Sequence, residues 1–503
     1  MTVWLLGDQL SPAARPLERT DHVLMIEAHG FAERLPYHPA KLTLVFSAMR
    51  HCRDALRDRG YEVTYIEAET FGDGLDEYFA AAPGDSLLMM EPASHGAGAR
   101  FEELVAARGG SLTRVENDRF LTSPETFDEW AGDRTVDDGF RQERWYRFVR
   151  RELDVLMDGD EPAGGEWNYD DQNRETPDEE WSPPPVPTFE PDAITKEAHD
   201  WVTERYDDHW GDDSLAAMVW PTTAEEARSA LDHFVATRLP EFGDYQDALV
   251  DGEWALSHSL LSSSLNLGLL HPREAVDAAV EAYETGDAPL NSVEGFVRQL
   301  IGWREFMRHV YRRAMPELNE ANQLDQTREL PPLYWDGGTD MNCLSEAVSH
   351  VHERGYAHHI ERLMVLSNFA LVYGADPHEL NRWFHLGFVD AYHWVTTPNV
   401  VGMGSFATDV LSSKPYASSG NYINKMSDFC SNCPYAVSRT TGEGACPFNA
   451  LYWDFLKEKE ETLRGTGRMG LMYSHVDNKD DEEWREIRER ASEVREQARE
   501  GEL

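Results

Sequence analysis

Basic residues are scarce in this chain. Lysine and arginine together number 46 among 503 residues, against 92 aspartates and glutamates, for a formal net charge of −46. At low salt such a chain repels itself and nucleic acid, whereas in molar salt the Debye length falls to about 3 Å and screens the repulsion. We therefore interpret the composition as that of a halophilic protein from a salt-rich cytoplasm. An acidic protein that avoids nucleic acid is the alternative, because overall charge does not exclude a local basic groove.

Long apolar runs are also absent. None reaches the roughly 20 residues of a membrane-spanning helix, so we expect no membrane partner. The N-terminal residues MTVWLLGDQL contain no basic segment and are typical of a first strand, so we expect no signal peptide and a cytoplasmic location. The GxGxxG pattern is missing, and a dinucleotide site is not supported. We expect a monomer.

Cysteine is scarce as well, with five residues, too few for a disulfide scaffold of this size. Cys430 and Cys433 form a CxxC pair, and Cys446 follows after twelve intervening residues. Three thiols within 17 residues indicate a metal site, with Cys343 as candidate fourth ligand and Cys52 as a buried structural thiol. The spacing leaves a zinc ion, an iron–sulfur cluster and unrelated free thiols open as interpretations.

The chain divides into four regions by pattern. Residues 1–130 alternate amphipathic stretches with apolar runs of strand length, which predicts a Rossmann-like parallel α/β domain. Residues 131–195 contain one predicted helix and a segment rich in proline, glycine and acidic residues, which indicates an interdomain linker. Residues 196–475 are mainly helical in pattern, and 476–503 are predicted to form a charged tail, either a solvated helix or frayed. The predicted strands lie at 3–10, 22–28, 41–48, 61–68 and 85–92.

Two motifs in the helical region carry polar chemistry. The segment 257–275, SHSLLSSSLNLGLLHPREA, offers hydroxyls at a helix start, which suits an anionic phosphate but is also typical of an ordinary serine-rich helix start. The adjacent His358 and His359 precede Arg362 by about one helical turn. Histidine exchanges protons near neutrality, and neighbours on a helix point about 100° apart, so the two cannot share one role. A single helical histidine is more often packed or solvated than catalytic.

Further blocks carry a family resemblance. The residues Gly302 to Phe306, with the letters GWREF, resemble a signature of photolyases and cryptochromes, and Arg362 and Asp390, 28 residues apart, resemble the Arg–Asp pair beside the flavin of that family. The more specific resemblance is to the iron–sulfur bacterial photolyases and cryptochromes, also called prokaryotic (6-4) photolyases. It is carried in order, up to about residue 455, by GDQL near the start, SAMRH at 47–51, GGEWNYDDQNR at 164–174, FGDYQDAL at 242–249, GYAHHIERLMVLSNFAL at 355–371, PNVVGMGSFA at 398–407 and KPYASSGNYINKMSDFCSNC at 414–433.

The resemblance implies a fold and three cofactors. The fold is an α/β Rossmann-like antenna domain followed by an all-α FAD-binding domain. The cofactors are FAD, a [4Fe-4S] cluster on Cys343, Cys430, Cys433 and Cys446, and 6,7-dimethyl-8-ribityllumazine as antenna. The implied FAD contacts are Ser257, His258, Ser259, Leu260, Leu261, Asn266, Gln299, Trp303, Arg304, Arg362, Asp390 and Asn399. The candidate antenna contacts, at the carboxyl edge where α/β sheets bind ligands, are Gly7, Asp8, Gln9, Glu27, His38, Ser47 and Met49.

The implied activity is blue-light repair of (6-4) photoproducts in DNA, a carbon–carbon lyase reaction. His359 is expected at the lesion with His358 in support, and Tyr416 is expected to line the same pocket. Lys414 and Arg439 are candidate contacts to DNA phosphates. A path for electrons between the surface and the flavin is expected through Trp335 and Trp383. A cryptochrome-type photoreceptor is the first alternative, and a non-light flavoprotein or zinc-stabilised DNA-binding module is the second.

Overall fold

The computed structural model describes residues 1–178, 180–206, 208–466 and 469–503. Its N-terminal part is a sheet of five parallel strands in the order β3-β2-β1-β4-β5. This doubly wound order confirms the predicted Rossmann-like domain. The strands are β1 (Thr2–Trp4), β2 (His22–Ala28), β3 (Glu62–Ala68), β4 (Ser86–Met90) and β5 (Ser111–Val115), and helices α2 (Phe71–Ala81) and α3 (Ala97–Ala106) lie between them in the chain.

The predicted strand at 41–48 is wrong, because these residues form the first half of helix α1 (Pro39–Asp58). Almost every side chain from Pro39 to Met49 is buried, since this half of the helix packs between the sheet and the later helices. A helix that is buried on all sides shows no polar face, and its apolar run cannot be told from a buried strand by periodicity. The fifth strand is β5, which was not among the predicted runs.

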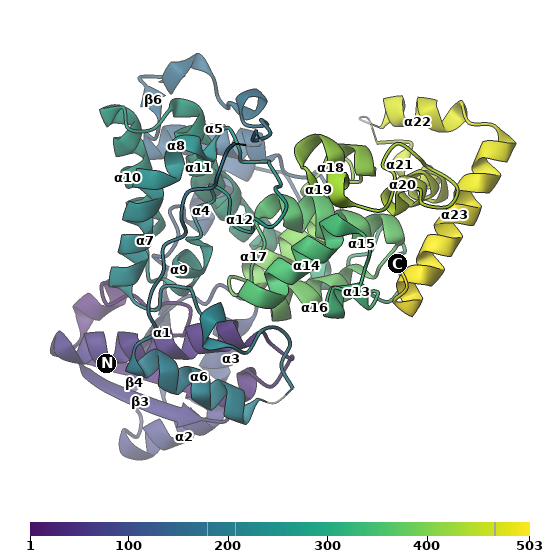
Figure 1. Cartoon of the computed structure of the whole chain (residues 1–503). Helices are drawn as coiled ribbons and strands as arrows, with labels where there is room; N and C mark the ends of the chain where they lie inside the picture. The colour runs from purple at the N-terminus through teal and green to yellow at the C-terminus, as the bar shows by residue number, and fades with distance from the viewer. Residues whose placement is uncertain (179, 207, 467–468) are drawn as a thin grey trace.

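The region 131–195 is only in part a linker. Helix α5 (Gln142–Leu153) belongs to the hydrophobic core, and its Trp145 is fully buried there. Helix α4 (Pro124–Ala131), which ends where the region begins, belongs to the same core. A short hairpin, β6 (Met157–Asp158) and β7 (Glu161–Pro162), follows. Among the described residues from 166 to 192 there is no α-helix or strand. The next helix, α6 (Ala193–Arg205), packs back onto α1 of the α/β domain rather than opening the helical domain (Figure 1).

The remaining chain is helical, as predicted. Where the structure describes this part of the chain, three π-helical segments interrupt it, and such segments often mark functional sites. They are η6 (Arg298–Arg304), η8 (Glu361–Ser367) and η9 (Pro398–Gly404). The α-helices are α7 (Ala224–Thr237), α8 (Leu239–Phe242), α9 (Ser262–Leu267), α10 (Pro272–Thr285), α11 (Leu290–Val297), α12 (Glu305–Ala314), α13 (Leu333–Asp336), α14 (Asn342–Arg354), α15 (Asn368–Tyr373), α16 (Pro377–Gly387), α17 (His393–Thr397), α18 (Gly420–Met426), α19 (Phe429–Asn432), α20 (Pro447–Glu458), α21 (Glu460–Leu463), α22 (Gly470–Asp477) and α23 (Asp481–Glu500).

Two large cores organise these helices. One joins the α1 face of the sheet to α5 and to the helices from α7 to α12, so the hydrophobic packing is continuous across the expected domain boundary. The other lies among the helices from α13 to α23. In the described part of the chain, no helix combines the length and apolar character needed to cross a membrane.

The C-terminal residues are not a solvated or frayed tail. Helix α23 lies along α20, and Ile487, Ala491 and Val494 are completely buried on its inner face (Figure 1). Its other faces carry the charged residues that dominate the composition of 476–503. The helix is therefore amphipathic and belongs to the second core.

Candidate cofactor and substrate site

An arginine–carboxylate pair lies at the centre of the helical domain. Arg362 of η8 donates two hydrogen bonds to Asp390, from Nη1 to Oδ1 and from Nη2 to Oδ2, each 3.0 Å long. Burial would raise the pKa of Asp390, but the facing guanidinium outweighs it and holds this pKa below its usual value. The Arg362 guanidinium also lies 4.3 Å from the ring centre of Phe388. The pair therefore presents a fixed cation whose orientation is set by a buried carboxylate.

The serine-rich segment 257–267 surrounds this pair. Ser262, at the start of α9, donates a hydrogen bond of 2.6 Å to Asp390, and Asn266 donates one of 2.9 Å to the Asp390 carbonyl. Leu260, just before the helix, has a φ of +58°, a conformation that non-glycine residues adopt mainly at constrained sites. Three buried hydroxyls of the segment have no hydrogen-bond partner among the described residues, those of Ser257, Ser263 and Ser264. Orphaned donors of this kind fit a phosphate-bearing cofactor.

The other expected FAD contacts lie around α9 at varying depth. Arg304 is buried behind α9, donates to the carbonyl of Leu265, and stacks over Phe120 with 4.6 Å from the guanidinium to the ring centre. Burial lowers its pKa to about 10. Trp303 packs against the first core. The side-chain amides of two further candidates donate to backbone carbonyls one turn earlier, at 3.2 Å for Gln299 and 2.8 Å for Asn399.

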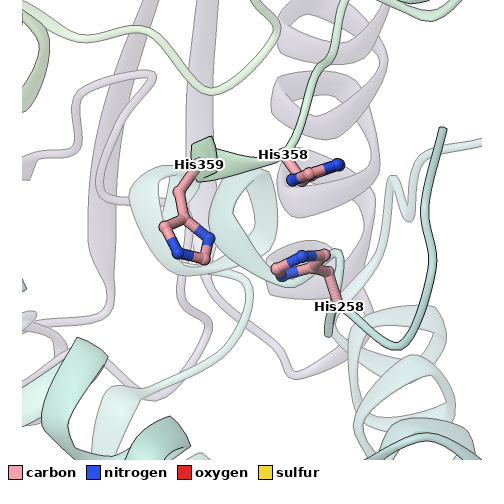
Figure 2. Close-up of side chains that lie close together, drawn as sticks. All are labelled: His258, His358 and His359. Atoms are coloured by element: carbon pink, nitrogen blue, oxygen red, sulfur yellow. The ribbon is translucent and has the colours of Figure 1, made fainter. Parts of the chain in front are cut away.

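Three histidines gather beside the Arg–Asp pair. The rings of His258 and His358 are stacked, with centroids 4.7 Å apart and planes at 14°, and the ring of His359 lies 5.2 Å from that of His258 (Figure 2). His258 and His358 are buried, whereas the side chain of His359 is 42% exposed and its Nε2 lies 3.4 Å from Oδ1 of Asp247. The helical stretch begins at His359, so only the second histidine of the pair is helical.

A buried carboxylate orients His358 from behind. Glu361 accepts a 2.8 Å hydrogen bond from Nδ1 of His350 and a 3.1 Å bond from the backbone N–H of His358, and its Oε2 lies 3.7 Å from Nε2 of His358. Burial would raise the pKa of Glu361, but the two imidazoles and these hydrogen bonds hold it below its usual value. Burial lowers the pKa of His358 to about 4 and that of His258 well below its usual value. Both rings are therefore neutral near pH 7.

The remaining expected pocket residues lie on one stretch of chain. Tyr416 is partly buried against the second core, in the irregular segment before α18. Lys414, two residues earlier, and Arg439 are exposed, as residues that contact DNA phosphates must be. Their roles stay predictions.

A row of tryptophans leads from the Arg–Asp pair to the surface. Trp383 is fully buried, with its ring centre 5.8 Å from that of Phe388, and Trp335 is 39% exposed. Trp210 lies between the two tryptophans, at 5.7 Å from Trp383 and 6.2 Å from Trp335, and donates a 2.6 Å hydrogen bond to the Trp335 carbonyl. Sequence reasoning missed Trp210, because it lies in the connector after α6 and more than 120 residues from either partner.

The four expected ligand cysteines line one cavity. Cys343 is in the first turn of α14, Cys430 is in α19, Cys433 follows α19, and Cys446 precedes α20. A Cβ on Gly420 would lie 2.7 Å from Sγ of Cys446, so this wall of the cavity requires glycine. The structure therefore brings together four thiols from three separate parts of the chain.

The four sulfur atoms share the cavity without forming a tight group. Within the described residues, no three of the four sulfur atoms lie within 4.8 Å of one another. Burial raises the pKa of Cys430 to about 11 and that of Cys446 to about 12. Cys52, the fifth cysteine, is buried in α1 away from the cavity, which agrees with its predicted structural role.

Three of the expected antenna contacts follow the first strand, and a fourth, Met49, lies against one of them. Gly7, Asp8 and Gln9 follow β1, and a Cβ on Gly7 would lie 3.1 Å from Sδ of Met49. Burial raises the pKa of Asp8 to about 6. The buried Oε1 of Gln9 has no partner among the described residues, so an acceptor is left for a bound donor.

The other three antenna candidates form hydrogen bonds with other residues of the protein. Glu27 accepts hydrogen bonds from Arg50 and from the hydroxyl of Tyr65. His38 caps α1 through the N–H of Ala40, and its Nε2 lies 2.9 Å from the carbonyl oxygen of His352. Ser47 bonds to the hydroxyl of Thr195 in α6, at 2.9 Å. These contacts give each of the three residues a role in holding the fold together, and their antenna role stays a prediction.

Comparison with known proteins decides the family. The family described as deoxyribodipyrimidine photo-lyase-related protein matches residues 3–216. Over 483 residues the chain is 40% identical to a (6-4) photolyase of Agrobacterium fabrum, with 94% of each protein covered. The chain belongs to the photolyase family. Membership makes it an enzyme of photolyase type, a class of flavoproteins that act in DNA repair, and it confirms the resemblance found in the sequence.

Solved structures of the photolyase family share the fold. A class III photolyase from Agrobacterium tumefaciens has a TM-score of 0.59 at 16% identity and covers 99% of this chain and 96% of its own. A Synechocystis cryptochrome has a TM-score of 0.59 at 12% identity, covering 99% and 98%. A Sulfolobus tokodaii photolyase solved with two FAD molecules has a TM-score of 0.54 at 14% identity, covering 98% and 100%. Because the group contains both photolyases and a cryptochrome, the fold alone does not separate repair from signalling.

Proposed function

We propose that this photolyase repairs (6-4) photoproducts in DNA under blue light. The observation that carries the proposal is the cluster of His258, His358 and His359 beside the Arg362–Asp390 pair, in a chain 40% identical to a (6-4) photolyase over nearly its whole length. Repair of such a lesion requires an electron and the movement of a proton or hydroxyl between its two bases. The site provides residues for both requirements.

FAD is the proposed electron donor, and excitation of its fully reduced form supplies the electron. The orphaned hydroxyls of Ser257, Ser263 and Ser264 are suited to its diphosphate. Arg362 offers a cation to the flavin ring, and Asp390 keeps that cation oriented. The other expected contacts, from His258 to Asn399, extend this site. Phe388 and Tyr356 lie over the guanidinium, at 4.3 and 5.0 Å from its carbon to their ring centres, and the Arg362 side chain stays only partly exposed.

His359 is the proposed acid at the lesion. It is the exposed member of the histidine cluster, and the carboxylate of Asp247 is positioned to pair with its protonated form. His358, which is buried and neutral near pH 7, holds the neighbouring wall of the pocket with Glu361 behind it. Tyr416 completes the pocket in this proposal, and Lys414 and Arg439 contact the DNA phosphates. Photolesion DNA is thus the proposed partner.

The four-cysteine cavity is proposed to hold a [4Fe-4S] cluster. Four thiolates around one zinc ion, with Zn–S bonds of about 2.3 Å, lie about 3.8 Å apart in a tetrahedron. Sulfur atoms that are not gathered within 4.8 Å favour a larger centre, and a cluster of iron and sulfide is larger.

The antenna and the electron path complete the proposal. We infer that 6,7-dimethyl-8-ribityllumazine binds at Gly7, Asp8, Gln9 and Met49, where Gln9 leaves an acceptor free and Gly7 allows close approach. We infer that electrons for flavin reduction pass from Trp335 through Trp210 to Trp383, because successive rings lie about 6 Å apart. The domain division is proposed as an antenna unit that includes α6 and a FAD-binding unit that extends through α23.

A repair assay tests the function. The reduced protein is incubated in molar salt, under blue light, with an oligonucleotide that carries one defined (6-4) lesion. We expect the lesion to disappear in the wild type, and His359→Ala to reduce the rate by at least about 100-fold with FAD still bound, because an acid of this kind contributes that much. His475→Ala, an exposed histidine of α22, serves as the control. Absence of repair in the wild type with a normal flavin spectrum refutes the lyase and leaves the photoreceptor.

The cluster has a separate test. Cys433→Ala removes one ligand, and we expect a loss of bound iron and of the broad absorption near 400 nm, with a lower yield of folded protein. Cys52→Ala is the matched control, since Cys52 is buried outside the cavity. Normal iron content in Cys433→Ala, measured by mass spectrometry of the purified protein, would remove this residue from the ligand set.

A further inference from the structure

The histidine cluster has a property that repair chemistry does not use. One ring nitrogen from each of His258, His358 and His359 lies within 4.8 Å of the other two. Figure 2 shows the three rings around a common space, and they come from separate segments, the loop before α9 and the start of the helix that contains η8. Three imidazoles at this separation can converge on one ion.

Two of these nitrogens are buried and have no partner among the described protein residues. Nε2 of His258 and Nδ1 of His358 have no hydrogen-bond partner among the described residues. The two residues are only 6% and 1% exposed, so solvent cannot satisfy the nitrogens freely. An unpaired buried acceptor costs roughly 1–3 kcal/mol, and an ion that accepts its lone pair would remove that cost.

Carboxylates lie behind two of the rings. Oε2 of Glu361 is 3.7 Å from Nε2 of His358, and Oδ1 of Asp247 is 3.4 Å from Nε2 of His359. Metal-bound histidines characteristically direct their second nitrogen to a carboxylate, which fixes the ring and makes it a better ligand. The other nitrogen of each of these rings is therefore available to an ion. The neighbouring cation, Arg362, has its charge paired with Asp390.

We propose that His258, His358 and His359 form a binding site for a divalent transition-metal ion of the zinc class. Three nitrogen donors favour zinc, copper or nickel over magnesium and calcium, which prefer oxygen. The half-exposed side of His359 leaves a fourth position open to the pocket, as in zinc sites that keep one water. The site binds the ion in the absence of DNA.

The proposal has a consequence for repair, and this part rests on the proposed function. An ion on His358 and His359 occupies the lone pairs that proton transfer requires and fills the space beside the lesion. Zn²⁺ therefore acts as a reversible inhibitor of repair, while photoreduction of the flavin, which uses the tryptophans, continues. A chelator restores repair.

The binding test uses the whole protein with its flavin and cluster, and Zn²⁺ alone as the probe. Bound zinc is measured by equilibrium dialysis and mass spectrometry, with iron measured in the same sample to show that the cysteine cavity has not exchanged its metal. We expect one tightly bound zinc per chain in the wild type and an affinity at least about tenfold lower in Asp247→Asn. A carboxylate that pairs with the second nitrogen of a metal-bound histidine typically contributes that much to the affinity. His359→Ala is expected to lose the site altogether.

Two controls locate the ion. His475→Ala removes an exposed histidine outside the cluster and should bind zinc like the wild type. His29→Ala removes a histidine from the other group of potential ligands, Glu27, His29 and Glu67. Zinc binding that survives His359→Ala, or that is lost in His29→Ala, overturns the proposal, as does a wild type that binds no zinc beyond its cluster.

Inhibition is measured separately from binding. We expect Zn²⁺ to slow repair of the lesion oligonucleotide without slowing flavin photoreduction, and millimolar Mg²⁺ not to reproduce the effect. Zinc that binds but leaves the repair rate unchanged overturns the inhibitory role. A protein that repairs nothing refutes the proposed function, but the dialysis result still decides whether the three histidines bind metal.

Discussion

At the scale of single residues, Glu361 links two histidines of the site. It is completely buried and contacts His350 and, more distantly, His358. Burial would lower the pKa of His350, but Glu361 outweighs it and holds this pKa above its ordinary value. A carboxylate and a histidine that shift each other in this way stabilise the fold only while both are charged.

The pH dependence of this pair follows from the directions of its two pKa shifts. The depressed pKa of Glu361 gives a contribution that is present above its ordinary value of 4.5 and is lost as the pH falls through the folded value. The raised pKa of His350 gives one that is complete below its ordinary value of 6.5 and is lost as the pH rises through the folded value. The pair therefore stabilises the fold most between pH 4.5 and pH 6.5. Glu346, 3.6 Å from the same histidine, adds to the second contribution.

Glu361→Gln should therefore destabilise the protein more at pH 6 than at pH 9. We expect a loss of roughly 3 kcal/mol at pH 6, because the change leaves a buried imidazolium without its partner. Denaturant unfolding at the two pH values measures it. His350→Gln removes the other half of the pair, and the double variant should lose little more than either single variant. Equal losses at pH 6 and pH 9 would show that the pair is not charged in the folded protein.

At the scale of elements, α23 shows how composition can hide a packed face. Its acidic and basic residues dominate the 20 positions from Asp481 to Glu500, yet its buried residues recur every three or four positions against α20. Arg490, on the buried face, donates to the carbonyl of Ala445, the residue before Cys446 of the cysteine cavity. The last helix therefore supports one wall of the cysteine cavity.

A charge placed on the inner face of α23 should separate a packed helix from a free tail. Val494→Asp buries an unpaired carboxylate, and we expect a loss of more than about 3 kcal/mol together with lower iron content. Ser492→Asp introduces the same charge on the exposed face and should change stability by less than about 0.5 kcal/mol. Thermal unfolding and iron analysis measure both variants. Two equal and small effects would mean that the helix does not contribute to the second core.

At the scale of the whole molecule, the net charge of −46 is the dominant feature. The Debye length is about 10 Å at 0.1 M salt and about 3 Å at 1 M, so self-repulsion across the surface is strong in the first case and weak in the second. The same repulsion opposes the approach of DNA. A photolyase with this surface is therefore expected to fold and to bind DNA best in concentrated salt.

Raising KCl from 0.1 M to 2 M should increase the unfolding temperature. We expect a gain of about 2 kcal/mol in stability, or roughly 2 °C for a chain of this length, because screening relieves repulsion that the compact state feels more than the unfolded chain does. Differential scanning calorimetry measures the shift. Sorbitol at the same osmolality serves as the control for effects of excluded solutes. A temperature that does not rise in KCl, or that rises equally in sorbitol, would contradict the electrostatic explanation.

The sequence by itself determined the family, the order of the two main units and the grouping of four cysteines, which line one cavity in the structure. These are local or composition-based properties, and strand β2 (His22–Ala28) coincides with its predicted run because a buried strand between two others shows an uninterrupted apolar pattern. The tertiary structure alone decided that 41–48 is helical, that α6 returns to the α/β domain and that α23 is packed. Burial on every side, or against a distant partner, removes the periodic signal that a sequence carries.

The site divides in the same way. Arg362, Asp390 and the adjacent histidines could be predicted, since motifs preserve their spacing along the chain. His258 as part of the histidine cluster and Trp210 between the two tryptophans could not, because each meets its partners through folding of segments that no short motif joins. The pairing of Glu361 with His350, outside the block that contains Glu361 and His358, could not be predicted either. Which nitrogens are left unpaired, and which carboxylate faces them, is a property of distances between chain segments, and only the tertiary structure specifies those distances.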